Sequence, residues 1–369
     1  MSELLKDVMN ERAGAIEQPR LDLQAIVTNG DKRIRRNRIV TAVAATAAAT
    51  VVAVAAVSVG DNDELSQPDR IQPATGGGFE ERTTTYANGP VIHYGTKQID
   101  VSPHSISSFV QTDDGFVFTD KGGTVYLTTG DNVGVIGQTN QPYGTLLAAA
   151  DTGPYITWLD TDASTFKVYD TALRSEVASV KQPQQGRDVG EFDRLAVLAL
   201  DGSTAYWHTS DGVVSYDVDS GRSQVVKAGA STNWLGDVAD GTLVRMSFDD
   251  QSMTISPDPE AKGPVVPGYG HADLSPDAGY VATDANDSEQ VYDVATGKDV
   301  TPAADEYSFI AVVQWSDDDS FTAVGIKHGN VMKEPFDLLT CSVAAGTCTV
   351  AAESVALPRD VQFPIGASD

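Results

Sequence analysis

The chain has 369 residues and a formal net charge of −27, and 41% of its residues are hydrophobic. This length and hydrophobic content are typical of a globular protein with a large buried core, not of a disordered chain. The acidic balance argues against nucleic acid as a partner, because a phosphate-binding surface needs clustered Lys and Arg. Residues 1–60 carry 8 of the 25 basic residues and 6 of the 52 acidic residues. A short basic segment therefore precedes a long acidic body.

The first 38 residues are expected to form a short helical tail. Apolar residues recur every three or four positions within residues 3–16, and a second short pattern ends near position 30. One interpretation is that the tail docks into a groove of a cytoplasmic protein through four apolar anchors, namely Leu5, Val8, Met9 and Ile26. The other, which we favour, is that the tail lies on the inner leaflet of a membrane, held by the five basic residues between positions 32 and 38.

Residues 39–59 are predicted to form a transmembrane helix. This segment of 21 residues contains no charge, and its length is that needed to cross about 30 Å of hydrocarbon. Basic residues precede it and acidic residues follow it, so the positive-inside rule places the N-terminus in the cytoplasm and the body outside. A cleaved secretory signal is the alternative, because small residues suited to cleavage lie near its end. Residues 60–80 are interpreted as a linker, and residues 81–369 as the extracytoplasmic domain.

Short runs rich in Val, Tyr and Thr, separated by turn pairs, dominate the body and predict an all-β fold. A turn residue precedes such a run six times, at spacings of 38, 49, 39, 38 and 41 residues. A unit of about 40–45 residues with four short strands is typical of a β-propeller blade. The six turn residues are Gly115, Gly153, Gly202, Gly241, Gly279 and Ser320.

Strand-like segments at both ends of the body lie outside these six units. They are residues 91–94 and 98–101 near its start and residues 361–364 near its end. Because a propeller closes its ring by building one blade from both termini, we expect seven blades, with six as the alternative. Such a ring presents its loops on two faces and around a central channel.

The clearest repeat lies within residues 270–298. It contains Gly270-His271, Leu-Ser-Pro-Asp at positions 274–277 and Val-Tyr-Asp-Val at positions 291–294. These residues resemble a WD40-type or TolB-like propeller blade, and the whole chain is similar to membrane-anchored propeller proteins of the actinobacterial envelope. The resemblance implies a propeller over about residues 81–369, with no ligand or activity carried over. It also implies a structural role for His271, whose ring would hydrogen-bond a partner in the same sheet, with Thr283 and Asp284 as candidates.

The two cysteines, Cys341 and Cys348, are predicted to form a disulfide. Residues 340–350 have the pattern of a hairpin with its midpoint between Ala344 and Ala345, so the cysteines would face each other across two strands. Such a bond fits an oxidising exterior. Metal binding is the alternative, but two thiolates without a His nearby in the sequence make a poor zinc site.

No catalytic motif is present in the sequence. The five His residues form no HExxH pattern, and no Ser lies in a GxSxG setting. Acidic clusters such as Asp160/Asp162 and residues 317–319 are predicted to be turn residues, since Asp bonds its own backbone in turns. Calcium is the alternative, although the spacing of a calcium loop is missing, and no cofactor is expected. The four Trp residues are expected to pack inside the fold.

Two functional hypotheses remain from the sequence. The first is a single-pass membrane protein whose outer propeller acts as a binding, sensor or scaffold module without catalysis. The second is a propeller-based extracellular hydrolase or lyase that uses loop carboxylates as acid and base on a glycan or peptide. Converging carboxylates with shifted pKa values would favour the second hypothesis, and a shallow polar face would favour the first.

Overall fold

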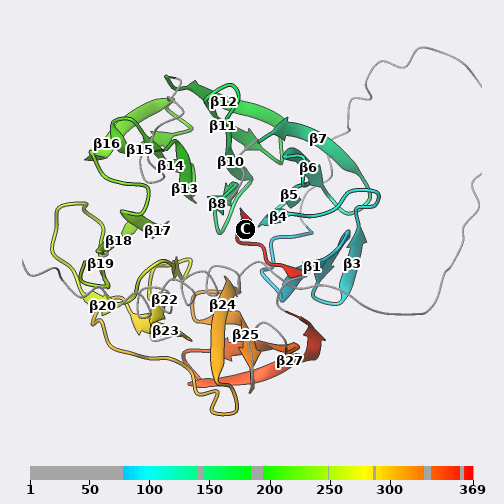
Figure 1. The fold of residues 1–369 in the computed structure, drawn as a ribbon, viewed down its shortest axis with the longest axis vertical. Helices are drawn as coiled ribbons and strands as arrows, with labels where there is room; N and C mark the ends of the chain where they lie inside the picture. Colours follow the sequence, from blue (N-terminus) through cyan, green and yellow to red (C-terminus); the bar gives the residue numbers. More distant parts are fainter. Residues whose placement is uncertain are drawn as a thin grey trace, which may run out of the picture. The chain divides into compact units, whose positions relative to one another are not determined.

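The computed structural model describes residues 78–139, 144–183, 194–247, 249–285, 288–327, 334–357 and 361–368. These residues form a ring of seven β-sheets around a common axis (Figure 1). The sheets are the blades of a propeller, so the all-β class and the count of seven blades are confirmed. Within the described ranges, no helix is long and apolar enough to cross a membrane. The tail, the predicted span and the linker up to residue 77 lie outside these ranges.

Each blade is an antiparallel sheet whose strands follow one another from the ring axis to the rim. Blade 1 contains β1 (Thr85–Asn88), β2 (Val91–Tyr94), β3 (Lys97–Asp100) and β28 (Val361–Gln362). Blade 2 contains β4 (Ser108–Thr112), β5 (Gly115–Thr119), β6 (Thr124–Thr128) and β7 (Val133–Gln138). Blade 3 contains β9 (Leu147–Ala149), β10 (Tyr155–Asp160), β11 (Thr165–Asp170) and β12 (Ser175–Lys181).

The remaining blades continue around the ring in chain order. Blade 4 contains β13 (Ala196–Asp201), β14 (Thr204–Thr209), β15 (Gly212–Asp217) and β16 (Arg222–Ala228). Blade 5 contains β17 (Leu235–Ala239), β18 (Thr242–Ser247), β19 (Ser252–Ser256) and β20 (Val265–Pro267). Blade 6 has three strands among the described residues, β21 (Ala272–Leu274), β22 (Tyr280–Ala285) and β23 (Ser288–Asp293). Blade 7 contains β24 (Phe309–Trp315), β25 (Ser320–Ile326), β26 (Phe336–Ser342) and β27 (Thr347–Ala356).

Burial falls from the inner strands to the rim. Strands β4 and β5 are buried at every position, because blades pack against both of their faces. At the rim, β16 and β27 are largely exposed. The strongly apolar runs of the sequence therefore became the inner and middle strands, and the runs rich in polar residues became the outer strands.

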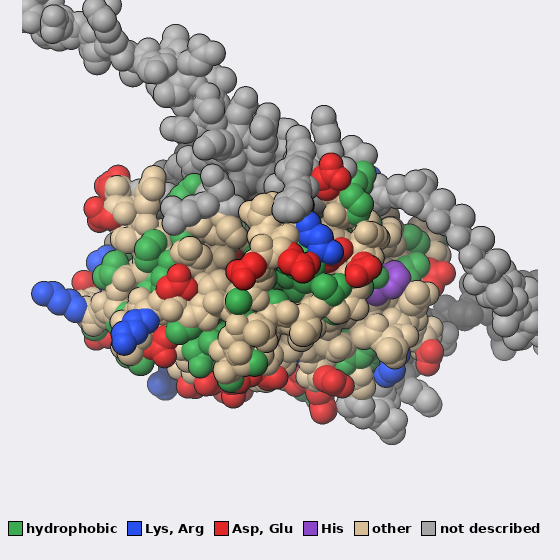
Figure 2. All heavy atoms as spheres, turned by 90° about the horizontal axis from the view of Figure 1, so that it is seen from below, with side chains coloured by type: hydrophobic (Ala, Val, Ile, Leu, Met, Phe, Trp, Pro, Cys, Tyr) green, Lys and Arg blue, Asp and Glu red, His purple; other side chains and the backbone are tan. Residues whose placement is uncertain are grey.

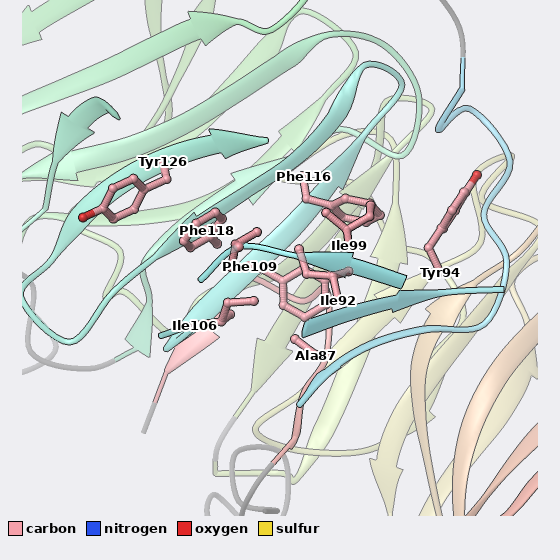
Figure 3. Packing of buried hydrophobic residues seen from close by; sticks show 10 residues of the cluster. Ala87, Ile92, Tyr94, Ile99, Ile106, Phe109, Phe116, Phe118 and Tyr126 are labelled. Atoms are coloured by element: carbon pink, nitrogen blue, oxygen red, sulfur yellow. The ribbon is translucent and has the colours of Figure 1, made fainter. Parts of the chain in front are cut away.

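The core consists of apolar clusters, several of which lie between neighbouring blades. Figure 3 shows one of them, in which side chains from blades 1 and 2 interlock around three Phe residues. Its Phe116 ring meets Tyr94 edge-on and Phe109 in a tilted geometry, while Phe118 and Tyr126 are stacked, and such pairs stabilise aromatic packing beyond the area buried. The Phe residues are Phe109, Phe116 and Phe118, each with no exposed surface.

Both ends of the body build blade 1. Strand β28 pairs antiparallel with β1, with Ala87 opposite Gln362 and Asn88 opposite Val361. The innermost strand of this blade thus comes from the C-terminus, and its other three strands come from the start of the body. The expected closure of the ring by both termini is confirmed.

The last residues continue beyond β28 toward the centre of the ring (Figure 1). The Gly366 amide donates to the Phe109 carbonyl of blade 2, and the Gly366 carbonyl accepts from the amides of Leu146 and Leu147 next to blade 3. Strand β29 (Ala367–Ser368) then pairs with β8 (Gly144–Thr145). The C-terminal segment therefore joins blades 1, 2 and 3.

The periodic turn residues lie between the first and second strands of their blades or, in the case of Gly115 and Ser320, at the first position of the second strand. Gly202 and Gly241 have φ of +53° and +70°, a conformation that a residue with a side chain adopts only with strain. These turns lie at the same position of successive blades, which explains why their spacing gives the repeat length. The repeat predicted from these glycines is confirmed.

Candidate functional site

Aspartate side chains hold neighbouring blades together at these turns. The Asp113 carboxylate of blade 2 accepts a hydrogen bond of 2.7 Å from the Gly153 amide of blade 3. In the same way, the Asp201 carboxylate of blade 4 accepts a bond of 2.8 Å from the Gly241 amide of blade 5. Hydrogen bonds to a charged acceptor are stronger than neutral ones. Two of the periodic glycines are therefore also the donors of bonds between blades.

Further along the ring, two such bonds join three consecutive blades. The Asp237 carboxylate of β17 accepts a bond of 2.7 Å from the Leu274 amide of β21. The Glu289 carboxylate of β23 accepts a short bond from the Val312 amide of β24. Blades 5, 6 and 7 are thus joined in series by carboxylates that bond the inner strand of the next blade.

Several ionisable groups gather on and beside the inner strands at this place, and we call them the axial cluster. Asp237 and Asp273 lie on the neighbouring inner strands β17 and β21, and Asp151 follows the inner strand β9. His271 directly precedes β21, and its Nδ1 lies 3.5 Å from Oε1 of Glu289. The cluster therefore comprises four carboxyl groups and one imidazole drawn from blades 3, 5 and 6.

The electrostatics of the cluster favour bound protons. Burial, together with the nearby Asp151 carboxylate, raises the pKa of Asp237 to about 7, although the Leu274 amide opposes this change. Burial and the neighbouring Asp237 raise the pKa of Asp273 well above its usual range. The Asp151 carboxyl has a pKa raised to about 6 by removal of water, but this residue is exposed and solvent screens it more than the other two.

His271 carries the positive charge of the cluster. Burial lowers its pKa, but the carboxylates of Glu289, Asp273 and Asp237 outweigh burial and raise it to about 9. The His271 side chain is 38% exposed, whereas that of Glu289 is only 8% exposed. At 3.5 Å the two form an ion pair that lacks a well-formed hydrogen bond. Glu289 is held in place by its second bond, to Val312.

Thr283 and Asp284 are the two candidate partners of the His271 ring from the sequence, and the bonds found for them involve other groups. The Thr283 hydroxyl donates to the Pro267 carbonyl at 2.8 Å, and the Asp284 amide donates to the carbonyl of His271 at 3.4 Å. The contact found for the imidazole is with Glu289, one strand further out than Thr283 and Asp284. His271 lies within the same sheet as its partner, as expected, but the partner is a carboxylate of β23.

A second group of polar contacts lies where the chain enters the propeller. The Arg82 guanidinium, whose side chain is 9% exposed, binds the Asp113 carboxylate at 2.9 Å and the Phe79 carbonyl at 2.8 Å. The Gln111 amide donates to the Phe79 and Glu81 carbonyls, at 2.8 and 3.0 Å. The first residues of the body are thus fixed to blade 2 through buried or half-buried bonds.

A cavity of about 440 Å³ lies beside this entry segment. Its lining includes Glu80, Glu81, Tyr94 and Lys97. No member of the axial cluster lines it. Among the described residues, no group of three or more His, Cys, Asp or Glu is arranged to hold a metal ion.

The acidic turn residues have the role expected of them. Asp160 accepts a bond of 3.0 Å from the Ala163 amide, and Asp317 accepts one of 3.0 Å from the Asp319 amide. These bonds close the turns that connect strands. Acidic side chains are also spread over the side of the ring shown in Figure 2, where basic side chains occupy only a few places.

The predicted disulfide is present. Cys341 and Cys348 lie opposite each other in the register of β26 and β27, and a bond joins their sulfur atoms. Of the Trp residues, Trp158, Trp207 and Trp315 are buried as expected, and Trp234 is partly exposed.

Comparison with known proteins adds little beyond the fold. No protein-family model matches the sequence, and no curated protein is significantly similar to it. A chain in a crystal structure of the mitotic checkpoint complex is 12% identical, with a TM-score of 0.47 over 83% of this chain and 89% of that chain. Hsv2 of Kluyveromyces lactis is 14% identical, with a TM-score of 0.42 over 65% of this chain and 75% of that chain. U3-55K is 12% identical, with a TM-score of 0.43 over 72% and 84%.

These similarities carry no inference about the ligand of this chain. The seven-bladed fold rests on the sheet topology and on the pairing of both ends in blade 1. The axial cluster, which the sequence analysis did not single out, has a weak signal in the sequence. Asp237 and Asp273 each interrupt a short apolar run just before a repeat turn.

Proposed function

We propose that this protein is a single-pass membrane protein whose propeller lies outside the cytoplasm and acts as a binding or scaffold module. The observation that carries this proposal is the closed ring. Hydrogen bonds between neighbouring blades, together with the pairing of the C-terminal segment in blade 1, fix the positions of the loops. A rigid scaffold that presents loops at fixed positions suits recognition, because little ordering is required on binding.

The proposed location rests on two supports. The sequence contains an uncharged segment of 21 residues with basic residues before it and acidic residues after it. The structure contains the Cys341–Cys348 disulfide, and disulfides persist in oxidising compartments. Both supports favour a propeller on the outer side of a membrane, with the tail of residues 1–38 in the cytoplasm.

The location is tested by protease protection in intact cells or spheroplasts that express the full-length chain with an N-terminal epitope. We expect protease added outside to shorten the chain to a fragment that keeps the epitope and the first 60 residues or so. A chain that stays intact until the membrane is opened would refute the orientation. A chain found in the soluble fraction without its first 60 residues would instead support a cleaved signal.

The binding role is tested by purifying the full-length protein in detergent beside a version that lacks residues 2–31. Mass spectrometry then identifies what co-purifies with each. A partner present in both samples at equal stoichiometry would be bound by the propeller, as proposed. A partner lost with the truncation would instead be bound by the tail, whose proposed anchors are Leu5, Val8, Met9 and Ile26.

One observation favours the enzyme alternative. The carboxyl groups of Asp237 and Asp273 have raised pKa values at adjacent inner strands, and such groups are suited to general acid and base chemistry. The cavity of about 440 Å³ described above lies elsewhere, beside the entry segment. Hydrolysis of a glycan or peptide mixture by the full-length protein, abolished by Asp273→Asn, would favour the enzyme over the binding module.

A further inference from the structure

We propose that the joint between blades 5 and 6 is a proton-controlled clamp. Proton uptake by the Asp237 and Asp273 carboxyl groups closes the joint, and proton release loosens it. This role goes beyond the proposed binding function and holds wherever the propeller resides.

The geometry of the joint is the first support. Asp237 and Glu289 each bond the inner strand of the following blade, through the Leu274 and Val312 amides. The Trp315 indole also donates to the Asp273 carbonyl at 3.2 Å. The joint between blades 5 and 6 therefore depends on an ionisable side chain, that of Asp237, and not on apolar packing alone.

The inner strand of blade 6 is short. Strand β21 has only three residues. A short strand has few backbone pairs of its own, so the bond from the Leu274 amide to Asp237 adds directly to what holds this strand beside blade 5.

Charged groups from every neighbouring element surround the two carboxyls. Asp237 faces Asp151, which follows β9, and it faces Asp273 of β21. Arg82 and Asp201 act on Asp151, with opposite effects on its charge.

His271 and Glu289 complete this environment from blade 6. Carboxylates outnumber cations, so full ionisation places like charges on adjacent inner strands. Repulsion between like charges at a partly buried site is stronger than at the surface.

The thermodynamic linkage between proton binding and opening of the joint gives the direction of the pH effect. In the closed joint the Asp237 pKa is about 7, whereas a solvated carboxyl in an open joint titrates near its ordinary value of about 3.9. Between these two values the closed state holds a proton that the open state releases, so protons favour closure. A protonated Asp237 keeps a carbonyl oxygen for the Leu274 amide and loses its repulsion with Asp273.

The expected size of the effect follows from the same values. For one carboxyl, the equilibrium constant for opening would rise by up to about 50-fold between pH 5 and pH 7. Water that reaches the partly exposed cluster reduces this factor, so we expect about tenfold.

Hydrogen exchange of the full-length protein in detergent, read by mass spectrometry at pH 5, 6 and 7, tests the clamp. Exchange of each peptide is compared with the intrinsic rate at the same pH. We expect protection of the peptide that contains Leu274 to fall by about tenfold from pH 5 to pH 7. The peptide that contains Gly241, bonded by Asp201 at another joint, is the internal control and should change by less than about twofold.

Two matched variants sharpen the test. In Asp237→Asn the side chain keeps an acceptor for the Leu274 amide but cannot ionise, so protection at pH 7 should equal that at pH 5. Asp201→Asn makes the same change at the joint of blades 4 and 5. Because Asp201 acts on Asp237 only through Asp151, this variant should change the pH dependence much less than Asp237→Asn does. The proposal is overturned if wild-type protection at Leu274 does not depend on pH, or if Asp237→Asn retains the full dependence. Should Asp237→Asn fail to fold, the comparison of peptides within the wild-type protein decides.

Discussion

Removal of one aromatic side chain tests whether the C-terminal segment closes the ring. Phe363 is 3% exposed and packs in a cluster with Phe336 of blade 7, whose ring centre lies 5.9 Å away. Burial of such a side chain contributes about 2–3 kcal/mol, and the cavity left by its loss raises the cost of Phe-to-Ala changes to about 3–5 kcal/mol. We expect Phe363→Ala to lower the free energy of unfolding by about 3 kcal/mol, because a segment near the chain end relaxes partly into the space.

Urea unfolding followed by tryptophan fluorescence measures this change. The midpoint should fall, while the dependence of the free energy on urea should stay the same if the ring still unfolds as one unit. Val350→Ala is the matched control, since Val350 on the outer strand β27 is 44% exposed and its loss should cost less than about 0.5 kcal/mol. A loss below about 1 kcal/mol for Phe363→Ala would refute the packing of the closing segment.

Three further predictions concern other parts of the ring. Replacing Cys341 and Cys348 by Ser should lower the free energy of unfolding by about 2–3 kcal/mol, because the disulfide restricts a short loop of the unfolded chain; unfolding with and without reductant checks this. Gly366→Ala should destabilise the protein by more than about 1 kcal/mol, because φ is +69° and a Cβ atom would overlap the carbonyl oxygen of Leu147. Urea unfolding measures this loss, and an unchanged free energy of unfolding would contradict the strain. The melting temperature should rise as pH falls from 8 to 5, because Asp237 and His271 have pKa values of about 7 and about 9, above their ordinary values, and the folded protein then binds protons that the unfolded chain releases. A melting temperature that falls over this range would show that other groups control stability.

The repeat could be predicted from the sequence because turns impose residue types. Gly202 and Gly241 need a positive φ, and their spacing measured the blade directly. The closing blade could be predicted because an open sheet edge is unfavourable, so strand-like ends such as residues 361–364 had to pair. The disulfide followed from the midpoint of one hairpin, which fixes the register of Cys341 and Cys348.

The axial cluster could not be predicted in the same way. Whether Asp237 and Asp273 approach each other depends on how two blades pack, and periodicity within one blade carries no information on this. The resemblance implied a partner of His271 in the same sheet, with Thr283 and Asp284 as candidates. The contact found for the imidazole is with Glu289, one strand further out in that sheet. Local patterns fix turns and strands, while contacts between side chains of different strands or blades depend on the assembled ring.

The use of the C-terminus as the innermost strand of blade 1 has a consequence for biosynthesis. Until residues 361–368 have left the ribosome, blade 1 lacks its strand at the axis, and β1 has one unpaired edge. The ring therefore closes only when residues 361–368 return to the blade that was made first. In the proposed orientation, six blades would already have emerged across the membrane by then. A chain cut short before residue 361 would thus keep a blade 1 that lacks its innermost strand.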